Sequence, residues 1–156
     1  MDYNKEERTK LFDSFVHTLE ELSEIVVQLT KAETAKAEVA SSGEHGKMDS
    51  FLKEEQALLL RFRGLEQQRN RKAIELGWKD LTFRQIIENV EKEDVAVLSP
   101  LFTQMEKQIE ELARARDSSN RIISVRLREF EHILGASTLG GFPEAGGPSR
   151  FHDRYV

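Results

Sequence analysis

The chain has 156 residues, about the length of one domain. Charged residues make up 33% and hydrophobic residues 38%, which suits long helices that bury one stripe and expose the rest. The absence of cysteine excludes disulfides and cysteine-ligated metals, and the net charge of −5 argues against a dedicated nucleic-acid binder. The charged N-terminus and short apolar runs predict neither a secretory signal nor membrane insertion, so we expect a cytoplasmic protein.

The first predicted helix runs from about residue 4 to about residue 40. Its apolar residues recur three or four positions apart, which places them on one helical face; they are Leu11, Phe15, Leu19, Leu22, Val26 and Leu29. No proline precedes Pro100, so nothing in this region stops a helix. Residues 31–40 are mostly alanine and charged residues, and we expect this end of the helix to bury little and to protrude.

Serine and glycine in residues 41–46 predict a turn, followed by a second helix over residues 48–76 that stops at Gly77. The apolar face of this helix contains Phe51, Leu58, Phe62, Leu65 and Leu76. Arg69 and Lys72 occupy two positions of this face at which the spacing predicts apolar residues. An antiparallel hairpin would place the basic stretch 61–72 beside the acidic residues of 20–24. We expect the two to pair; contact of the basic residues with phosphates is the alternative.

Thr82 and Gln85 have the spacing of a capping box, which predicts a short third helix ending near Val90. Ser99 and Pro100 have the order of an N-cap and a first helical residue, so the fourth helix is expected to begin there. A kinked helix that begins at Asp94 is the alternative. Either helix would end at Leu134, before Gly135.

These elements predict an all-α fold: a long antiparallel hairpin, a short helix and a long final helix form an elongated bundle over residues 1–134. Residues 135–156 hold five of the nine glycines and two of the three prolines. We expect this segment to be a flexible, disordered tail.

Sequence motifs of catalysis are missing. The chain has neither a Gly-x-Ser-x-Gly nucleophile motif nor a Gly-x-x-x-x-Gly-Lys phosphate loop. Glu129 and His132 have the Glu-x-x-His spacing of di-iron bundles, but such a site needs two of these motifs and two further glutamates. We therefore expect no enzyme activity, no metal and no cofactor.

The second half of the fourth helix contains more apolar residues than one buried stripe needs. One stripe contains Ile123, Leu127, Phe130 and Leu134, and a second contains Ile122, Val125 and Ile133. The additional stripe is either a deeper core position or a docking surface for another helix. We take as candidate binding residues Ile122, Ile123, Leu127, Phe130, Ile133 and Leu134, with further contacts from Phe142, Phe151 and Tyr155 in the tail.

Several short motifs resemble the FlgN family of flagellar export chaperones. They are EEQALL at residues 54–59, LEQQR at 65–69, Leu76-Gly77 and NRII at 120–123. The resemblance implies a cytoplasmic chaperone without ATPase activity. Such chaperones bind the C-terminal segments of hook-associated proteins, prevent their premature assembly and deliver them to the flagellar type III export gate.

Two other functions fit the same sequence. One is a structural coiled-coil or adaptor protein that forms a homo-oligomer through the fourth helix. The other is a helical protein that contacts nucleic acid through its two arginine clusters, at 61–72 and 114–128.

Overall fold

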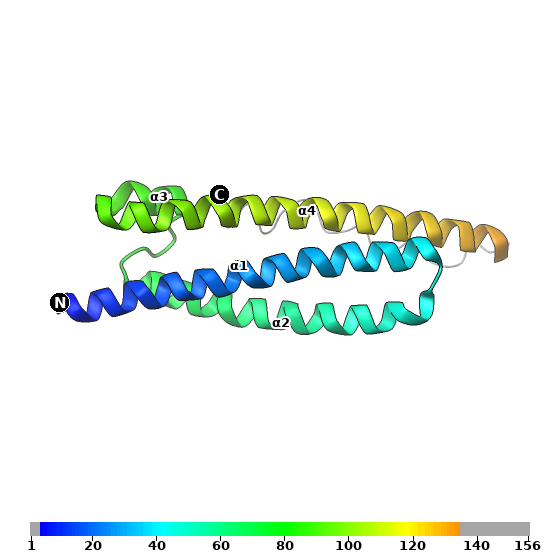
Figure 1. Ribbon diagram of the computed structural model, residues 1–156, viewed down its shortest axis with the longest axis horizontal. Coiled ribbons are helices and arrows are strands. Elements are labelled where there is room, and N and C mark those ends of the chain that lie inside the picture. Colours follow the sequence, from blue (N-terminus) through cyan, green and yellow to red (C-terminus); the bar gives the residue numbers. More distant parts are fainter. Residues whose placement is uncertain (1–3, 135–156) are drawn as a thin grey trace.

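The computed structural model describes residues 4–134, which form four helices (Figure 1). Helix α1 spans Lys5–Ser42, α2 His45–Glu75, α3 Phe83–Asn89 and α4 Lys92–Leu134. The described residues contain no strand. The predicted all-α fold, with a long hairpin followed by a short and a long helix, is therefore confirmed.

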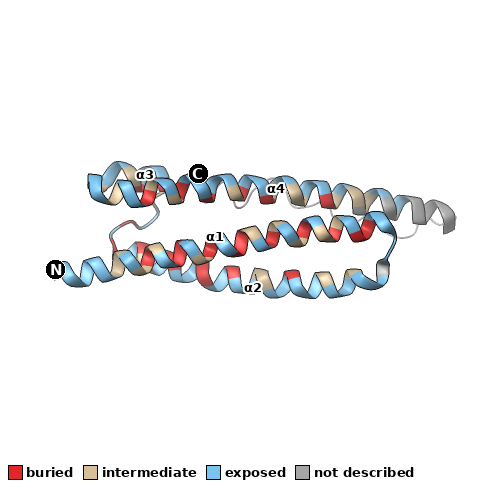
Figure 2. Cartoon of the chain, viewed as in Figure 1, coloured by how far each residue is buried: buried red, intermediate tan, exposed pale blue. Residues whose placement is uncertain are grey.

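Helix α1 lies between α2 and α4 (Figure 1). Both of these helices pack along α1, and no comparable contact joins α2 to α4 among the described helices. Buried residues accordingly run along α1 from Phe15 to Ala40 (Figure 2). The core of the protein is thus organised around one helix that is covered on two sides.

The α1–α2 turn lies within the predicted residues 41–46. Helix α1 ends at Ser42, and Gly43 follows with φ of 76°, a left-handed conformation that glycine adopts without the clash a Cβ would cause. Helix α2 then begins at His45. Because so few residues separate the two helices, α2 runs back along α1.

Two basic residues of α2 make contacts that the sequence did not predict. Lys72 reaches α1 by donating hydrogen bonds to the Thr18 hydroxyl (2.7 Å) and the Ser14 carbonyl oxygen (3.4 Å). Arg69 donates two hydrogen bonds, of 2.9 and 3.0 Å, to the carboxylate of Glu66 in its own helix. The hydrogen bonds of Lys72 to α1 therefore go to Ser14 and Thr18, and these two of Arg69 go to an acid of its own helix.

Residues 31–40 of α1 do not protrude. Glu33, Lys36, Val39 and Ala40 are all buried. The expectation was wrong because α4 continues along this part of α1 and covers the side that α2 leaves open, as the approach of Arg116 to Glu33 shows.

The segment between α2 and α3 closes one end of the core. The buried Trp78 packs edge-on against Phe15 and Phe12, with ring centroids 5.3 and 6.4 Å apart. The predicted capping box is present, because the Thr82 hydroxyl accepts from the Gln85 amide and the Gln85 side chain accepts from the Thr82 amide. Helix α3 ends at Asn89, as expected.

Helix α4 begins at Lys92 and continues through Pro100, so the predicted start at Ser99 is wrong. The backbone amides of Asp94 and Val95 already bond to the Glu91 carbonyl oxygen, which starts the helix near the alternative position. Leu98 and Phe102 on either side of the proline are buried in the core. Their packing holds the helix together where the proline removes a backbone hydrogen bond.

Replacing Pro100 by alanine should therefore stabilise the protein. The exposed proline lacks the amide that would bond to residue 96, and alanine restores it, so we expect a gain of at least about 1 kcal/mol. Thermal unfolding followed by circular dichroism measures the change, with Gln104→Ala on the same helix as the control. A lower melting temperature in Pro100→Ala would show that the packing of α4 requires the proline.

Candidate helix-docking site on α4

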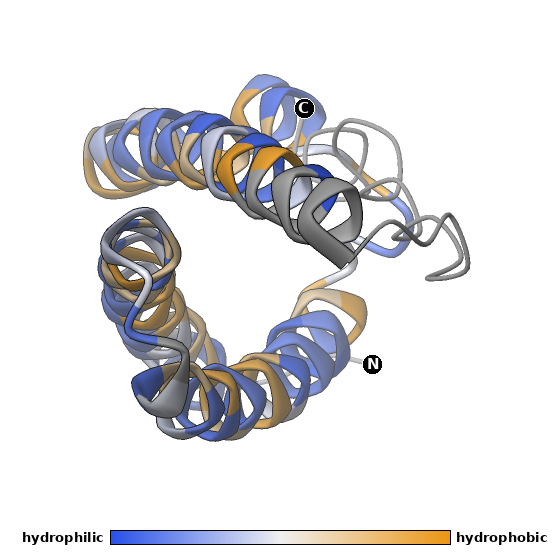
Figure 3. Cartoon of the chain, turned by 90° about the vertical axis from the view of Figure 1, so that its right-hand side faces the viewer, coloured by the Kyte–Doolittle hydropathy of each residue, from blue (hydrophilic) through white to orange (hydrophobic). Residues whose placement is uncertain are grey.

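The distal half of α4 contains the six predicted binding residues. Figure 1 shows that the last turns of this helix extend past the α1–α2 turn. Ile122 is half-buried, and Val125 one turn later is 51% exposed. The end-on view in Figure 3 shows hydrophobic turns of α4 directly before its grey end. This half of α4 therefore presents apolar surface without a described helix covering all of it.

Most of the predicted set lies beyond what the structure describes in detail. The side chains of Ile123, Leu127, Phe130, Ile133 and Leu134 lie outside the described ones, although their backbone belongs to α4. The predicted tail contacts Phe142, Phe151 and Tyr155 lie outside the described residues altogether. The structure thus places the six helical residues on one element and leaves the tail contacts as a prediction.

A buried charged cluster lies just before this apolar half. The Lys36 ammonium on α1 donates to Glu33 Oε1 at 3.1 Å and to Glu55 Oε2 of α2 at 2.9 Å. All three residues are buried, with Glu33 only 1% exposed. From α4, Arg116 Nε approaches Glu33 Oε1 at 4.0 Å. One cluster of charges therefore links the three long helices.

The two carboxyl groups of the cluster have opposite pKa shifts. Burial raises the pKa of Glu33, and the neighbouring Glu55 acts in the same direction. Burial alone would also raise the pKa of Glu55, but its contacts with Glu33 and Lys36 outweigh burial and lower it. The site therefore retains a proton on Glu33 more readily than on Glu55, and Lys36 offsets the charge that remains.

Polar contacts replace apolar packing where α4 approaches its distal half. The last described apolar residue of α4 that is fully in the core is Leu112. Arg116 and Ser119 follow on the same side of the helix, and the buried Ser119 hydroxyl forms no hydrogen bond to described residues. An orphan polar group and a long ion contact hold a helix less firmly than apolar packing does.

The sequence contained a signal for this cluster that our prediction missed. Glu33, Lys36 and Ala40 continue the three- and four-residue steps of Leu29 and its predecessors, so they belong to the same helical face. Charged residues on such a face are usually solvated. Only the approach of a third helix turns this position into a buried one.

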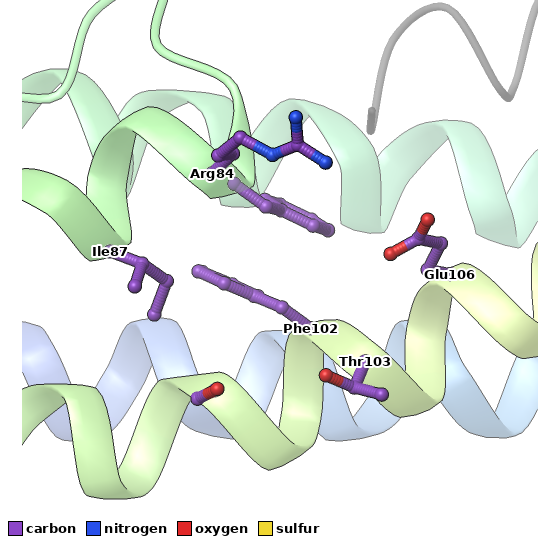
Figure 4. Close-up of a pocket in the computed structure, with 7 residues that line it drawn as sticks. Arg84, Ile87, Phe102, Thr103 and Glu106 are labelled. Carbon is purple, nitrogen blue, oxygen red and sulfur yellow. The ribbon is translucent and has the colours of Figure 1, made fainter.

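A shallow pocket of about 220 Å³ lies between α3 and α4 (Figure 4). The parallel rings of Phe83 and Phe102, with centroids 4.0 Å apart, form part of its lining. Arg84 and Glu106 come from different helices and flank the rings. The stacked rings attach α3 to the beginning of α4, at the end of the bundle opposite the distal half.

Within residues 4–134, no group of three or more histidine, aspartate and glutamate side chains could hold a metal ion. Nor does any described helix combine the length and the apolarity needed to cross a bilayer. Comparison of the chain with protein-family models, with curated proteins and with solved structures finds no match.

Lys36 should be essential to the charged cluster. Its replacement by methionine leaves two buried carboxyl groups facing each other, so we expect a loss of about 3 kcal/mol near neutral pH. Chemical denaturation measures the loss, with Lys31→Met at an exposed position of α1 as the control.

The loss should shrink as the pH falls toward 5. Without Lys36 the folded carboxyl pair binds protons more tightly than the unfolded chain, so stability falls with rising pH and returns when a proton is bound. A loss that is equal at both pH values, or as small as that in the control, would contradict the assigned role of Lys36.

Proposed function

We propose that this protein is a cytoplasmic export chaperone of the FlgN type. It binds the C-terminal segments of hook-associated proteins, prevents their premature assembly and brings them to the flagellar export gate. The observation that supports this best is the apolar second half of α4, in which Val125 is 51% exposed and whose last turns extend past the α1–α2 turn. A client helix laid along this surface would extend the bundle.

The bundle is suited to such a role because the hairpin and the first half of α4 form a packed scaffold for the second half of α4. The hairpin and the first half of α4 share one apolar core, and Leu112 is the last described side chain of α4 that belongs to it. A partner that binds the distal half would leave that core intact. A helix that lies in an apolar groove is a common mode of peptide recognition.

Apolar burial would supply most of the affinity. Each Å² of apolar surface removed from water contributes about 25 cal/mol, and ordering the client and losing its free motion offset part of this. Binding in the micromolar to nanomolar range, about −8 to −12 kcal/mol, would result. Such a complex protects the client and still releases it for export without a covalent or nucleotide-driven step.

The proposal is tested with the full chain and C-terminal peptides of hook-associated proteins. We expect binding by isothermal titration calorimetry, and at least about tenfold weaker binding by the double variant Ile122→Asp/Val125→Asp, because each change places a charge in the apolar interface. The matched control is Val97→Asp, at a similarly exposed valine (44%) near the opposite end of α4.

Three results would contradict the proposal. The peptides bind no tighter than unrelated amphipathic helices, or the double variant binds as well as the control, or the free protein forms a stable oligomer that the double variant abolishes. The last result would favour the structural protein that assembles through α4. Circular dichroism of both variants verifies that the helices remain folded.

A further inference from the structure

Helix α2 has a second seam that no described helix covers. Seven residues recur at steps of 3, 4, 3, 4, 4 and 3, which keeps them on one face for about six turns. All seven are exposed. This outer seam consists of Lys53, Gln56, Leu60, Arg63, Gln67, Arg71 and Ile74.

The outer seam has the same periodicity as the buried seam of α2. The buried seam follows steps of 3, 4, 3, 4, 4 and 3 as well, and faces α1. It consists of the half-buried Leu58 and the buried Glu55, Phe62, Leu65, Arg69, Ala73 and Leu76. Helix α2 packs along α1 and makes no comparable contact with α4. The outer seam is therefore a face that no described helix covers, on a helix that packs against one neighbour.

Exposed apolar residues gather on this side of α2. Leu60 is 71% exposed and Ile74 43%, and Leu52, 40% exposed, lies one turn before Gln56. These are three of the five large hydrophobic residues found exposed in the described chain. Leu60 and Ile74 lie 14 residues apart on the seam with Arg63 and Arg71 between them, so this face combines apolar and basic side chains.

The charge of the outer seam has one sign. Lys53, Arg63 and Arg71 are basic and none of the seven residues is acidic, although the whole chain has a net charge of −5. Among the described residues, none of these three cations forms an ion pair. The seam is thus a cationic stripe on an acidic protein, and its charges are not used within the bundle.

We propose that the outer seam of α2 binds an acidic amphipathic helix of a partner protein. Glutamate or aspartate residues of that helix pair with Lys53, Arg63 and Arg71, and its apolar residues contact Leu60 and Ile74. From Lys53 to Ile74 the seam is about 32 Å long at 1.5 Å per residue, the length of a helix of about 20 residues. This site is separate from the distal half of α4 and does not depend on the function proposed above.

Charge and geometry favour a helix over a phosphate-rich partner. Leu60 and Ile74 share the seam with the cations, and apolar side chains add nothing to a phosphate contact. The overall negative charge opposes the long-range approach of nucleic acid. A membrane surface would need a broad apolar face, whereas this stripe is narrow and contains two glutamines.

The test uses two model helices of about 28 residues, both with leucine at the core heptad positions. One has glutamate at the flanking positions and the other has lysine. We expect the full chain to bind the fluorescein-labelled glutamate helix at least about tenfold more tightly than the lysine helix, with affinity that falls between about 50 and 300 mM salt. Fluorescence anisotropy measures both affinities.

Charge reversal then locates the site. Arg63→Glu/Arg71→Glu should bind the lysine helix better than the glutamate helix, which reverses the preference of the wild type. The control Lys31→Glu/Arg61→Glu makes the same change in net charge at exposed positions outside the seam and should keep the wild-type preference. Circular dichroism establishes that both variants are folded.

The proposal is overturned if the glutamate helix does not bind, if both helices bind equally, or if the two double variants behave alike. It is also overturned if the wild type binds phosphatidylcholine–phosphatidylserine vesicles (about 3:1) or an RNA duplex of about 20 base pairs more tightly than the glutamate helix. Either of these last results would assign the seam to a lipid surface or to nucleic acid.

Discussion

Burial of α1 on two sides is the constraint on which the rest of the structure depends. Phe15, Leu22 and Ile25 are almost completely inaccessible, because α2 covers one side of the helix and α4 the other. Neither outer helix makes a comparable contact with the other among the described residues. The apolar face of α1 therefore holds two helices in place that have little mutual packing of their own.

In this arrangement, part of the surface of each outer helix is not covered by another described helix. Helix α2 buries one seam against α1 and exposes a second, cationic one. Among the described side chains, helix α4 shares the core as far as Leu112 and continues through a polar region at Arg116 and Ser119; its sequence then becomes apolar again. A bundle of this kind gains further stability by adding helices, which is the physical basis of both binding proposals.

The sequence was sufficient to predict the helices and their order, because periodicity, capping and the absence of early proline are local signals. The sequence was not sufficient where contacts between helices determine the structure. The helix that begins at Lys92 continues through Pro100 because Leu98 and Phe102 pack into the core, and Glu33 and Lys36 are buried only because a third helix approaches them. Of the candidate site, the sequence placed Ile122 on the apolar part of α4. It also placed Glu33 and Lys36 on the core-facing side of α1, but it did not show that a third helix buries them there.

The most direct test of the account is amide hydrogen exchange along α4 in the full chain, with and without a C-terminal segment of a hook-associated protein. We expect residues 120–134 to exchange much faster than residues 15–29 of α1 in the free protein, and the bound segment to slow their exchange while that of α1 is unchanged. If residues 120–134 are already as protected as α1 in the free protein, the surface is covered from within the molecule, and the account is wrong.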